Sequence, residues 1–192
     1  MKSKVLFFLT VFAFATTSIF AQKWSDAAID SLIAKMSIEE KVGQMTQIDL
    51  GVVAEGGICN LKQPQRIDIA KLQEAIGKYK IGSILNVGCG SGTISGPNWN
   101  VIHQTIIKEN KKTARLPIPI LYGIDAIHGA NYTKGATLFP QQIAQAATWN
   151  PALVEQANAV SAYETRASGI PWNFSPVLDL GRQPLWSRFF DT

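Results

Sequence analysis

The stretch PIPILYGIDAIHG, residues 117–129, is the part of the sequence that indicates the fold most clearly. Apolar residues at 119–124 predict a buried strand, and Asp125 stands directly after it. His128 follows three residues later, beside a glycine. In parallel sheets and barrels, ligands bind at the carboxyl ends of the strands. The stretch therefore predicts a buried parallel strand that ends at a candidate binding site.

Apolar and amphipathic runs alternate on both sides of this stretch. Further strands are expected at 45–48, 82–87 and 172–178, and helices at 25–36, 69–79, 98–113 and 150–167. Ser37 and Glu40 form a capping-box pattern that predicts another short helix, and residues 143–148 fit either a short strand or a helix end. Strands that alternate with helices predict an α/β protein with a parallel sheet.

The length of the chain sets a limit on this fold. Closed eight-stranded barrels of this kind take about 250 residues. The 192 residues provide four or five strands, and the sequence stops without a capping or turn signal. We therefore expect a piece of something larger.

Residues 1–21 have the features of an export signal. Lys2 and Lys4 precede an apolar run at 5–14, and small polar residues then lead to a cleavage point after Ala21. The apolar run is shorter than the roughly 20 residues that a membrane-spanning helix needs. We expect an exported protein, periplasmic or secreted, with no membrane partner after cleavage; the alternative is an uncleaved anchor.

Charge and cysteine content argue against two classes of protein. The 18 Lys and Arg exceed the 14 Asp and Glu by little, and signal cleavage would remove two of the lysines, so no nucleic-acid partner is expected. Cys59 and Cys89 lie 30 residues apart. Export permits a disulfide, but two cysteines make no disulfide framework, and the sequence favours unpaired thiols.

Two polar groups follow expected strands. One is Asp125, and the other is Asp179 with Arg182 after the strand at 172–178. A carboxylate near an arginine suits a polyhydroxyl ligand, because the carboxylate accepts from hydroxyl groups while the guanidinium donates to them. A structural ion pair between two loops explains the same residues, and both readings stay open at this point.

No metal or cofactor is expected. Asp125 and His128 could supply two metal ligands, but a catalytic zinc needs three. The other histidine, His103, lies within an expected helix, where a packing role is more common. The loop NVGCGSGTISG lacks the glycine spacing of a dinucleotide-binding loop.

Four segments together resemble one family. They are KMSIEEKVGQMTQ, GSILNVGCGSG, RLPIPILYGIDAIHGANYTKGATLFPQQIAQAATWNPALV and GIPWNFSPVLDLGRQPLWSR. In this order they resemble the amino-terminal part of a family 3 glycoside hydrolase of the β-glucosidase type. The branch that acts on N-acetylglucosamine usually carries Asp-Gln-Glu-Gly-Gly where this chain has DAIHG at 125–129. The resemblance therefore favours the β-glucosidase branch.

The resemblance implies an incomplete (β/α)8 TIM-type barrel, roughly its first half, over residues 22–192. It also implies a retaining mechanism on β-linked oligosaccharides or glucosides, which needs two carboxyl groups about 5 to 5.5 Å apart. In the family both groups lie in later segments, so no catalytic residue is expected in this chain, which should be inactive alone.

The resemblance carries two substrate-binding residues onto this sequence, Asp125 and Arg182. The positions expected to support them are His128, Asp179, Trp186 and Arg188. The arginine motif departs from its common form at Gln183 and Leu185, where charged residues are usual. The exact sugar, the linkage and the oligomeric state stay open.

Two rival hypotheses remain. One is a non-catalytic sugar-binding module built from the same half barrel, and a β-xylosidase-type specificity is a variant of the enzyme hypothesis. The other is an unrelated exported hydrolase that uses Asp125 and His128 with a metal, which bound metal would support.

Overall fold

The computed structural model describes residues 24–59, 64–88 and 92–189, so the expected signal segment lies outside the described residues. The chain divides into two compact units, 1–35 and 36–192. Within the first, helix α1 spans Asp26–Ala34, and the hydroxyl of Ser25 caps it by accepting a hydrogen bond from the Ala28 backbone N–H. The expected helix start is confirmed.

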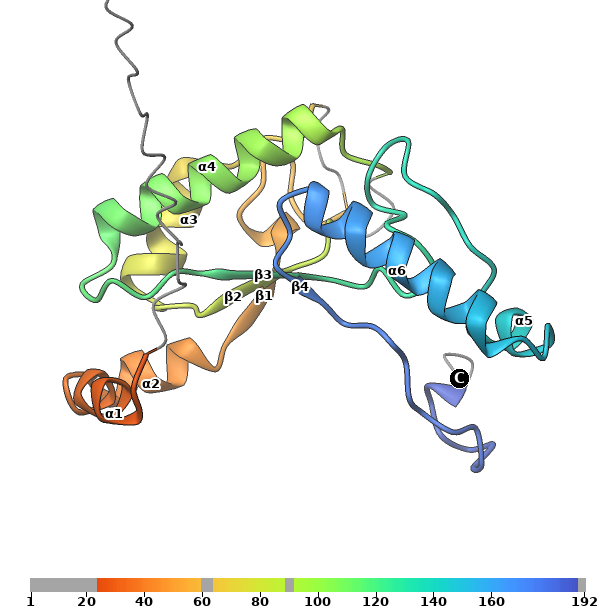
Figure 1. Ribbon diagram of the computed structural model, residues 1–192. Helices are drawn as coiled ribbons and strands as arrows, with labels where there is room; N and C mark the ends of the chain where they lie inside the picture. Colours follow the sequence, from red (N-terminus) through yellow and green to blue (C-terminus); the bar gives the residue numbers. More distant parts are fainter. Residues whose placement is uncertain (1–23, 60–63, 89–91, 190–192) are drawn as a thin grey trace, which may run out of the picture. The chain divides into compact units, whose positions relative to one another are not determined.

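The second unit contains a four-stranded parallel sheet. Its strands are β1 (Gln47–Asp49), β2 (Ser83–Leu85), β3 (Leu121–Ile124) and β4 (Trp172–Asn173). They lie in the order β1-β2-β3-β4, so each strand pairs with the one before it in the chain (Figure 1). The prediction of an α/β fold with a parallel sheet is confirmed.

Helix α2 (Ile38–Gln44) precedes β1, and the other helices connect the strands. They are α3 (Ile69–Gly77), α4 (Gly96–Thr113), α5 (Gln142–Ala146) and α6 (Pro151–Ala167), with a 3-10 turn, η1, at Leu50–Val52. The capping box of Ser37 and Glu40 is present at the start of α2, and Asn150 caps α6. The ambiguous segment 143–148 falls mainly in α5 and is therefore helical.

One face of the sheet packs against α3 and α4, which lie side by side above it in Figure 1. The fully buried side chains here include Ile84 and Ile124 from the sheet, Leu72 from α3, and Trp99 and Ile102 from α4. Burial of each such side chain stabilises the fold by about 1.5–3 kcal/mol. The side chains between this face and the two helices form the hydrophobic core, which holds the strands in position.

The opposite face of the sheet is open. Leu121 and Trp172 on this face are 49% and 41% exposed. The ring of Phe174 packs against Gly123, because a Cβ built on that glycine would lie only 2.3 Å from the ring. An aromatic side chain therefore packs against β3 at Gly123.

The strand expected at 172–178 is shorter than predicted, since β4 ends at Asn173. The last ladder-like hydrogen bond runs from the Phe174 backbone N–H to the Ile124 carbonyl at 2.9 Å. Pro176 has no N–H to donate, so the ladder cannot continue past it. Beyond this point the chain runs away from the sheet (Figure 1).

The expectation of unpaired cysteines is wrong for Cys59, which is disulfide-bonded. Cys89 lies outside the described residues. The expectation rested on the number of cysteines, which says nothing of how close the fold brings distant segments. The Gly88 backbone N–H donates to the Asp49 carboxylate at 3.1 Å, so the segments that follow β1 and β2 meet at one edge.

Candidate functional site

Each of the four strands ends in, or is followed directly by, an aspartate or an asparagine. These residues are Asp49, Asn86, Asp125 and Asn173. Parallel pairing brings them to the same edge of the sheet, where their short polar side chains bond to one another and to nearby backbone. The carboxyl edge of the sheet therefore carries a row of hydrogen-bonded polar side chains next to the apolar core.

Asp125 and Asn86 are joined by two hydrogen bonds. The Asn86 side-chain Nδ2 donates to Asp125 Oδ2 at 2.7 Å, and the Asp125 backbone N–H donates to Asn86 Oδ1 at 2.9 Å. Because a carboxylate only accepts and a backbone N–H only donates, this arrangement fixes the amide orientation. Within the described residues, the hydrogen bonds of the Asp125 carboxylate involve Oδ2 alone.

A second carboxylate, Asp49, is held by backbone groups. Its Oδ1 accepts from the Gly51 N–H at 2.7 Å, and its Oδ2 accepts from the Gly88 N–H. Tyr132 lies near both carboxylates: burial chiefly, and then the charges of Asp125 and Asp49, raise its pKa. Tyr132 therefore keeps its phenolic proton at neutral pH and can donate a hydrogen bond.

The loop after β3 holds His128 in place. Its Nδ1 lies 3.0 Å from the Phe139 carbonyl oxygen, and the Phe139 N–H donates to the His128 carbonyl at 2.7 Å. Since a carbonyl only accepts, Nδ1 carries a proton and donates it to this oxygen. His128 thus joins the beginning of this loop to its later part at Phe139.

An open hollow of about 810 Å³ lies at this edge, within the size range of sites for small ligands. Its lining residues come from the open face of the sheet, the loop after β3 and the chain after β4. The polar ones are Gln47, Asp125, His128, Asn131, Tyr132, Asp179 and Arg188. Such a lining suits a ligand with several hydroxyl groups, because carboxylates, amides and a guanidinium can all bond to hydroxyls.

The structure brings four of the six predicted site residues to this hollow: Asp125, His128, Asp179 and Arg188. Arg182 and Trp186 do not line it. The Arg182 side chain is exposed, and its backbone N–H donates to the Leu180 carbonyl at 2.8 Å. The pairing of Arg182 with Asp125 on one ligand therefore stays a prediction.

The residues of the site that sequence reasoning missed include Asn86, Asn131, Tyr132 and Phe174. Asn86 stands within an apolar run, where its polarity was a usable signal of a strand end. Asn131 lines the hollow, and its buried Oδ1 has no hydrogen-bond partner among the residues that the structure describes. The other two are brought to the site by loop geometry, which has no sequence period.

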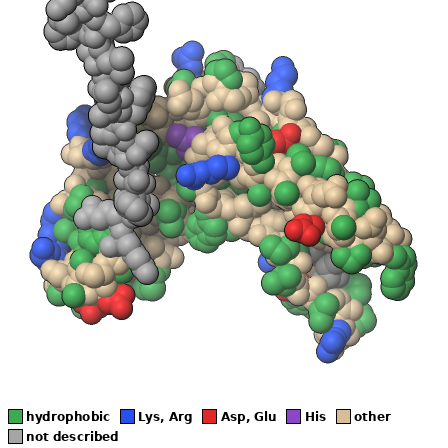
Figure 2. Space-filling model, viewed as in Figure 1, with side chains coloured by type: hydrophobic (Ala, Val, Ile, Leu, Met, Phe, Trp, Pro, Cys, Tyr) green, Lys and Arg blue, Asp and Glu red, His purple; other side chains and the backbone are tan. Residues whose placement is uncertain are grey.

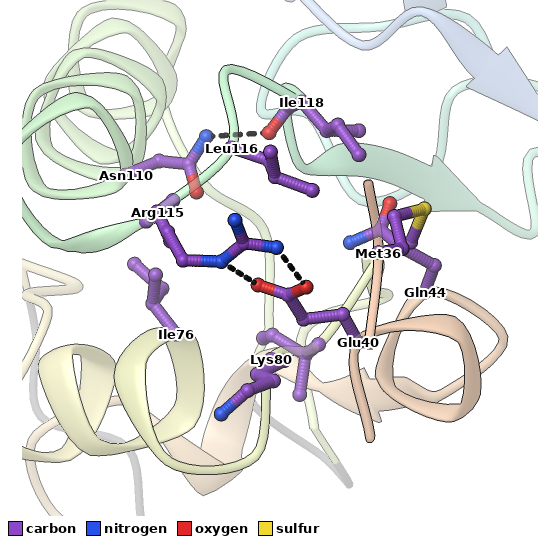
Figure 3. A pocket seen from close by; sticks show the side chains of 11 residues that line it. Met36, Glu40, Gln44, Ile76, Lys80, Asn110, Arg115, Leu116 and Ile118 are labelled. Atoms are coloured by element: carbon purple, nitrogen blue, oxygen red, sulfur yellow. Dashed lines mark hydrogen bonds and ion pairs between the residues drawn. The ribbon is translucent and has the colours of Figure 1, made fainter. Parts of the chain in front are cut away.

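A second, much smaller cavity of about 40 Å³ lies at the amino edge of the sheet (Figure 3). The guanidinium of Arg115 faces the carboxylate of Glu40 there, and both carboxylate oxygens accept from it. This space is enough for a few water molecules at most. In parallel α/β folds, the amino edge serves stability rather than ligand binding.

Within the described residues, no three His, Cys, Asp or Glu side chains gather as a metal site would require. None of the described helices combines the length and apolar character that crossing a membrane requires.

Comparison with known proteins identifies a family. Residues 37–191 match the family described as the glycosyl hydrolase family 3 N terminal domain. A lysosomal beta glucosidase of Dictyostelium discoideum is 40% identical over 177 residues, which is 87% of this chain and 20% of that protein. A putative beta-xylosidase of Formosa agariphila is 35% identical over 162 residues, 83% of this chain and 20% of that protein.

A periplasmic beta-glucosidase of Salmonella typhimurium is 27% identical over 163 residues, 85% of this chain and 18% of that protein. The chain thus spans about a fifth of the length of these curated relatives.

Two solved structures share the fold. A mutant beta-glucosidase from Listeria innocua in complex with laminaribiose superposes with a TM-score of 0.54 at 26% identity, over 84% of this chain and 20% of that one. A family 3 beta-N-acetylglucosaminidase from a Paenibacillus species superposes with a TM-score of 0.56 at 19% identity, over 76% of this chain and 25% of that one.

Proposed function

Because the chain belongs to glycoside hydrolase family 3, we propose that it is the amino-terminal part of an enzyme that releases terminal β-linked glucose-type sugars with retention of configuration. The observation that carries this proposal is Asp125, which lines an open polar hollow at the carboxyl edge of a parallel sheet. Its carboxylate is an acceptor suited to the hydroxyl groups of a terminal sugar.

In this proposal the chain supplies binding rather than bond cleavage. Asp125 accepts hydrogen bonds from sugar hydroxyls, and Arg182 donates to the same sugar. His128, Asp179, Trp186 and Arg188 support them. A retaining enzyme also needs a nucleophile and an acid/base about 5 to 5.5 Å apart. We assign both groups to segments outside residues 1–192, so this chain alone is expected to be inactive.

The same proposal extends the observed fold. The four sequential parallel strands correspond to roughly the first half of a (β/α)8 TIM-type barrel, of which residues 22–192 form part. Sequential strand order is expected in such a barrel, whereas a doubly wound sheet reverses its order.

We also propose that residues 1–21 are a signal peptide and that the protein is exported, to the periplasm or beyond the cell. The charged start, the apolar run and the small residues before position 22 support this. A relative named as periplasmic supports it as well.

The first test is to read the coding DNA beyond the codon for Thr192. An open frame that supplies an aspartate and a glutamate in later segments supports the proposal. The product of the complete frame should then hydrolyse an aryl β-glucoside, and Asp125→Ala should lower kcat/KM by roughly 10- to 100-fold through the lost charged hydrogen bonds. A product that binds glucose without hydrolysing any glycoside would instead support a sugar-binding module.

A β-xyloside is the second candidate substrate, because a relative 35% identical to this chain is named a putative beta-xylosidase. Glucose and xylose differ by one hydroxymethyl group, and even a single methylene in an apolar pocket changes kcat/KM by about 10- to 200-fold. Matched aryl β-glucoside, β-xyloside and β-N-acetylglucosaminide substrates compared by kcat/KM would identify the preferred sugar.

A further inference from the structure

Asn86 has an arrangement that a general structural role does not explain. It follows β2, and both atoms of its side-chain amide bond to one residue of the neighbouring strand end, Asp125. One bond goes to the carboxylate and the other comes from the backbone N–H of the same residue. The amide therefore holds one oxygen of the Asp125 carboxylate and the Asp125 backbone at the same time.

Asn86 is itself held from three directions. Its backbone has φ +48°, the left-handed region in which asparagine is among the few favoured non-glycine residues. Its backbone N–H donates to the Gly123 carbonyl at 3.0 Å, and its carbonyl accepts from the Tyr122 hydroxyl. The Tyr122 pKa is raised well above its usual range, chiefly by burial, so that hydroxyl remains a donor.

The two carboxylate oxygens of Asp125 differ in their hydrogen bonds. Oδ2 accepts from Asn86, whereas Oδ1 has no hydrogen bond to any described residue. An ionised carboxylate oxygen offers two acceptor positions. Oδ1 is thus left available to accept from a ligand, and Asp125 is one of the residues that line the hollow.

We propose that Asn86 is a positioning residue for substrate binding, because it holds Oδ2 of Asp125 and leaves Oδ1 to accept from a hydroxyl of the terminal sugar. The inference rests on the proposed function, since it needs Asp125 to bind sugar. Asn86 acts through Asp125 and has no contact with the sugar of its own.

The test uses the polypeptide made from the complete reading frame, with an aryl β-glucoside as substrate. Asn86→Gly removes the amide and keeps the left-handed backbone accessible. We expect kcat/KM to fall by about tenfold, the value of a hydrogen bond to a charged group. Asn86→Asp keeps the shape but replaces the donor with a second carboxylate, so kcat/KM should fall at least as far.

The matched control is Lys80→Gly. Lys80 also has a positive φ, +54°, and it lies before β2, at the opposite end of the same strand. This variant should change kcat/KM by less than about twofold, because it touches none of the carboxyl-edge network. A fall as large as that of Asn86→Gly would show that any glycine near β2 harms activity, and would overturn the inference.

Two further measurements separate positioning from mere stability. In a double-mutant cycle, adding Asn86→Gly to Asp125→Ala should cost less than about twofold, because the second residue acts through the first. The second measurement uses aryl glucosides that each lack one hydroxyl. On the one substrate that lacks the hydroxyl bound by Asp125, neither Asp125→Ala nor Asn86→Gly should lower kcat/KM. Additive losses, or effects that follow different hydroxyls, would overturn the inference.

Failure of the proposed function gives another pattern. If Asp125→Ala leaves kcat/KM unchanged, Asp125 does not bind sugar and the proposed function of the site fails. If Asp125→Ala lowers kcat/KM but Asn86→Gly does not, Asp125 binds sugar and only the role of Asn86 is wrong.

Discussion

Glu40 is the residue whose charge contributes most clearly to the fold. Its side chain accepts from the Ser37 backbone N–H at 2.9 Å, which closes the capping box of α2. It also accepts from Arg115, 75 positions later, with 2.8 Å between Nε and Oε1. The bond from Arg115 first, and that from Ser37 second, lower the pKa of Glu40 to about 2.

This pKa sets a pH dependence of stability. A carboxyl whose pKa is lower in the folded than in the unfolded chain stabilises the fold above its unfolded pKa, about 4.3 for glutamate. That stabilisation is lost as the pH falls from about 4.3 through about 2. We expect the melting temperature to drop across this window, and to drop less in Glu40→Gln, which should be less stable already at pH 7.

Glu74→Gln serves as the control for this prediction. Glu74 pairs with Lys78 four residues away on an exposed helix face, at 2.9 Å. Exposed pairs of this kind contribute about 0.3–0.5 kcal/mol. A pH profile of Glu40→Gln that coincides with the unaltered profile would contradict the assignment to Glu40.

At the scale of elements, the loop after β3 depends on Gly129. Its φ is +119°, and a Cβ there would lie 2.2 Å from the Thr137 carbonyl oxygen. Gly135, in the same loop, has φ +88° but open space around the Cβ position. Substitution of Gly135 therefore introduces backbone strain alone, whereas substitution of Gly129 introduces backbone strain and a steric clash.

We predict that Gly135→Ala lowers the free energy of unfolding by about 1–2 kcal/mol, the cost of a left-handed alanine. Gly129→Ala should cost at least about 3 kcal/mol, because the two loop segments must also move apart. Urea denaturation of both variants measures this difference. Equal losses would show that the contact between His128 and Phe139 does not need the close approach at Gly129.

The contact between Gly123 and Phe174 joins β3 to the chain after β4. Gly123→Ala would place a methyl group where the Phe174 ring lies. We expect a loss of about 1–3 kcal/mol from overpacking. Phe174→Leu added to Gly123→Ala should recover part of it, since the smaller side chain makes room; a fully additive loss in urea denaturation would exclude a direct clash.

Elements with local signals were predictable, and those set by distant contacts were not. Ser25, Ser37 and Asn150 mark helix starts through their own hydroxyl or amide groups, so the sequence alone located them. Asp125 was identified because it directly follows an apolar run. Asn86 was missed because its role needs β2 beside β3, and Phe174 because its position depends on a glycine 51 residues earlier.

At the scale of the whole molecule, the open face of the sheet and other exposed apolar side chains stand out. Figure 2 shows hydrophobic side chains over the region of α5 and α6, where Ile143 and Trp149 are 74% and 93% exposed. Large exposed apolar areas mark surfaces that associate or become covered.

We therefore predict concentration-dependent self-association of residues 22–192 in analytical ultracentrifugation. Leu121→Lys places a charge on the open face and should weaken this association. Val101→Lys is the control, since Val101 is 56% exposed on α4 and Leu121 is 49% exposed on the sheet. Equal effects of the two substitutions would show that the open face is not the surface that associates.

The sequential order of the strands also has a consequence for how the chain acquires its structure. Since β2 pairs with β1, β3 with β2 and β4 with β3, each of the described strands after β1 meets a pairing partner that comes earlier in the chain. Contacts between neighbours in sequence form faster than distant ones, and domains made on the ribosome fold from the amino end. The polypeptide can therefore add one strand and helix at a time as it emerges from a ribosome, and the carboxyl edge gains one aspartate or asparagine with each addition.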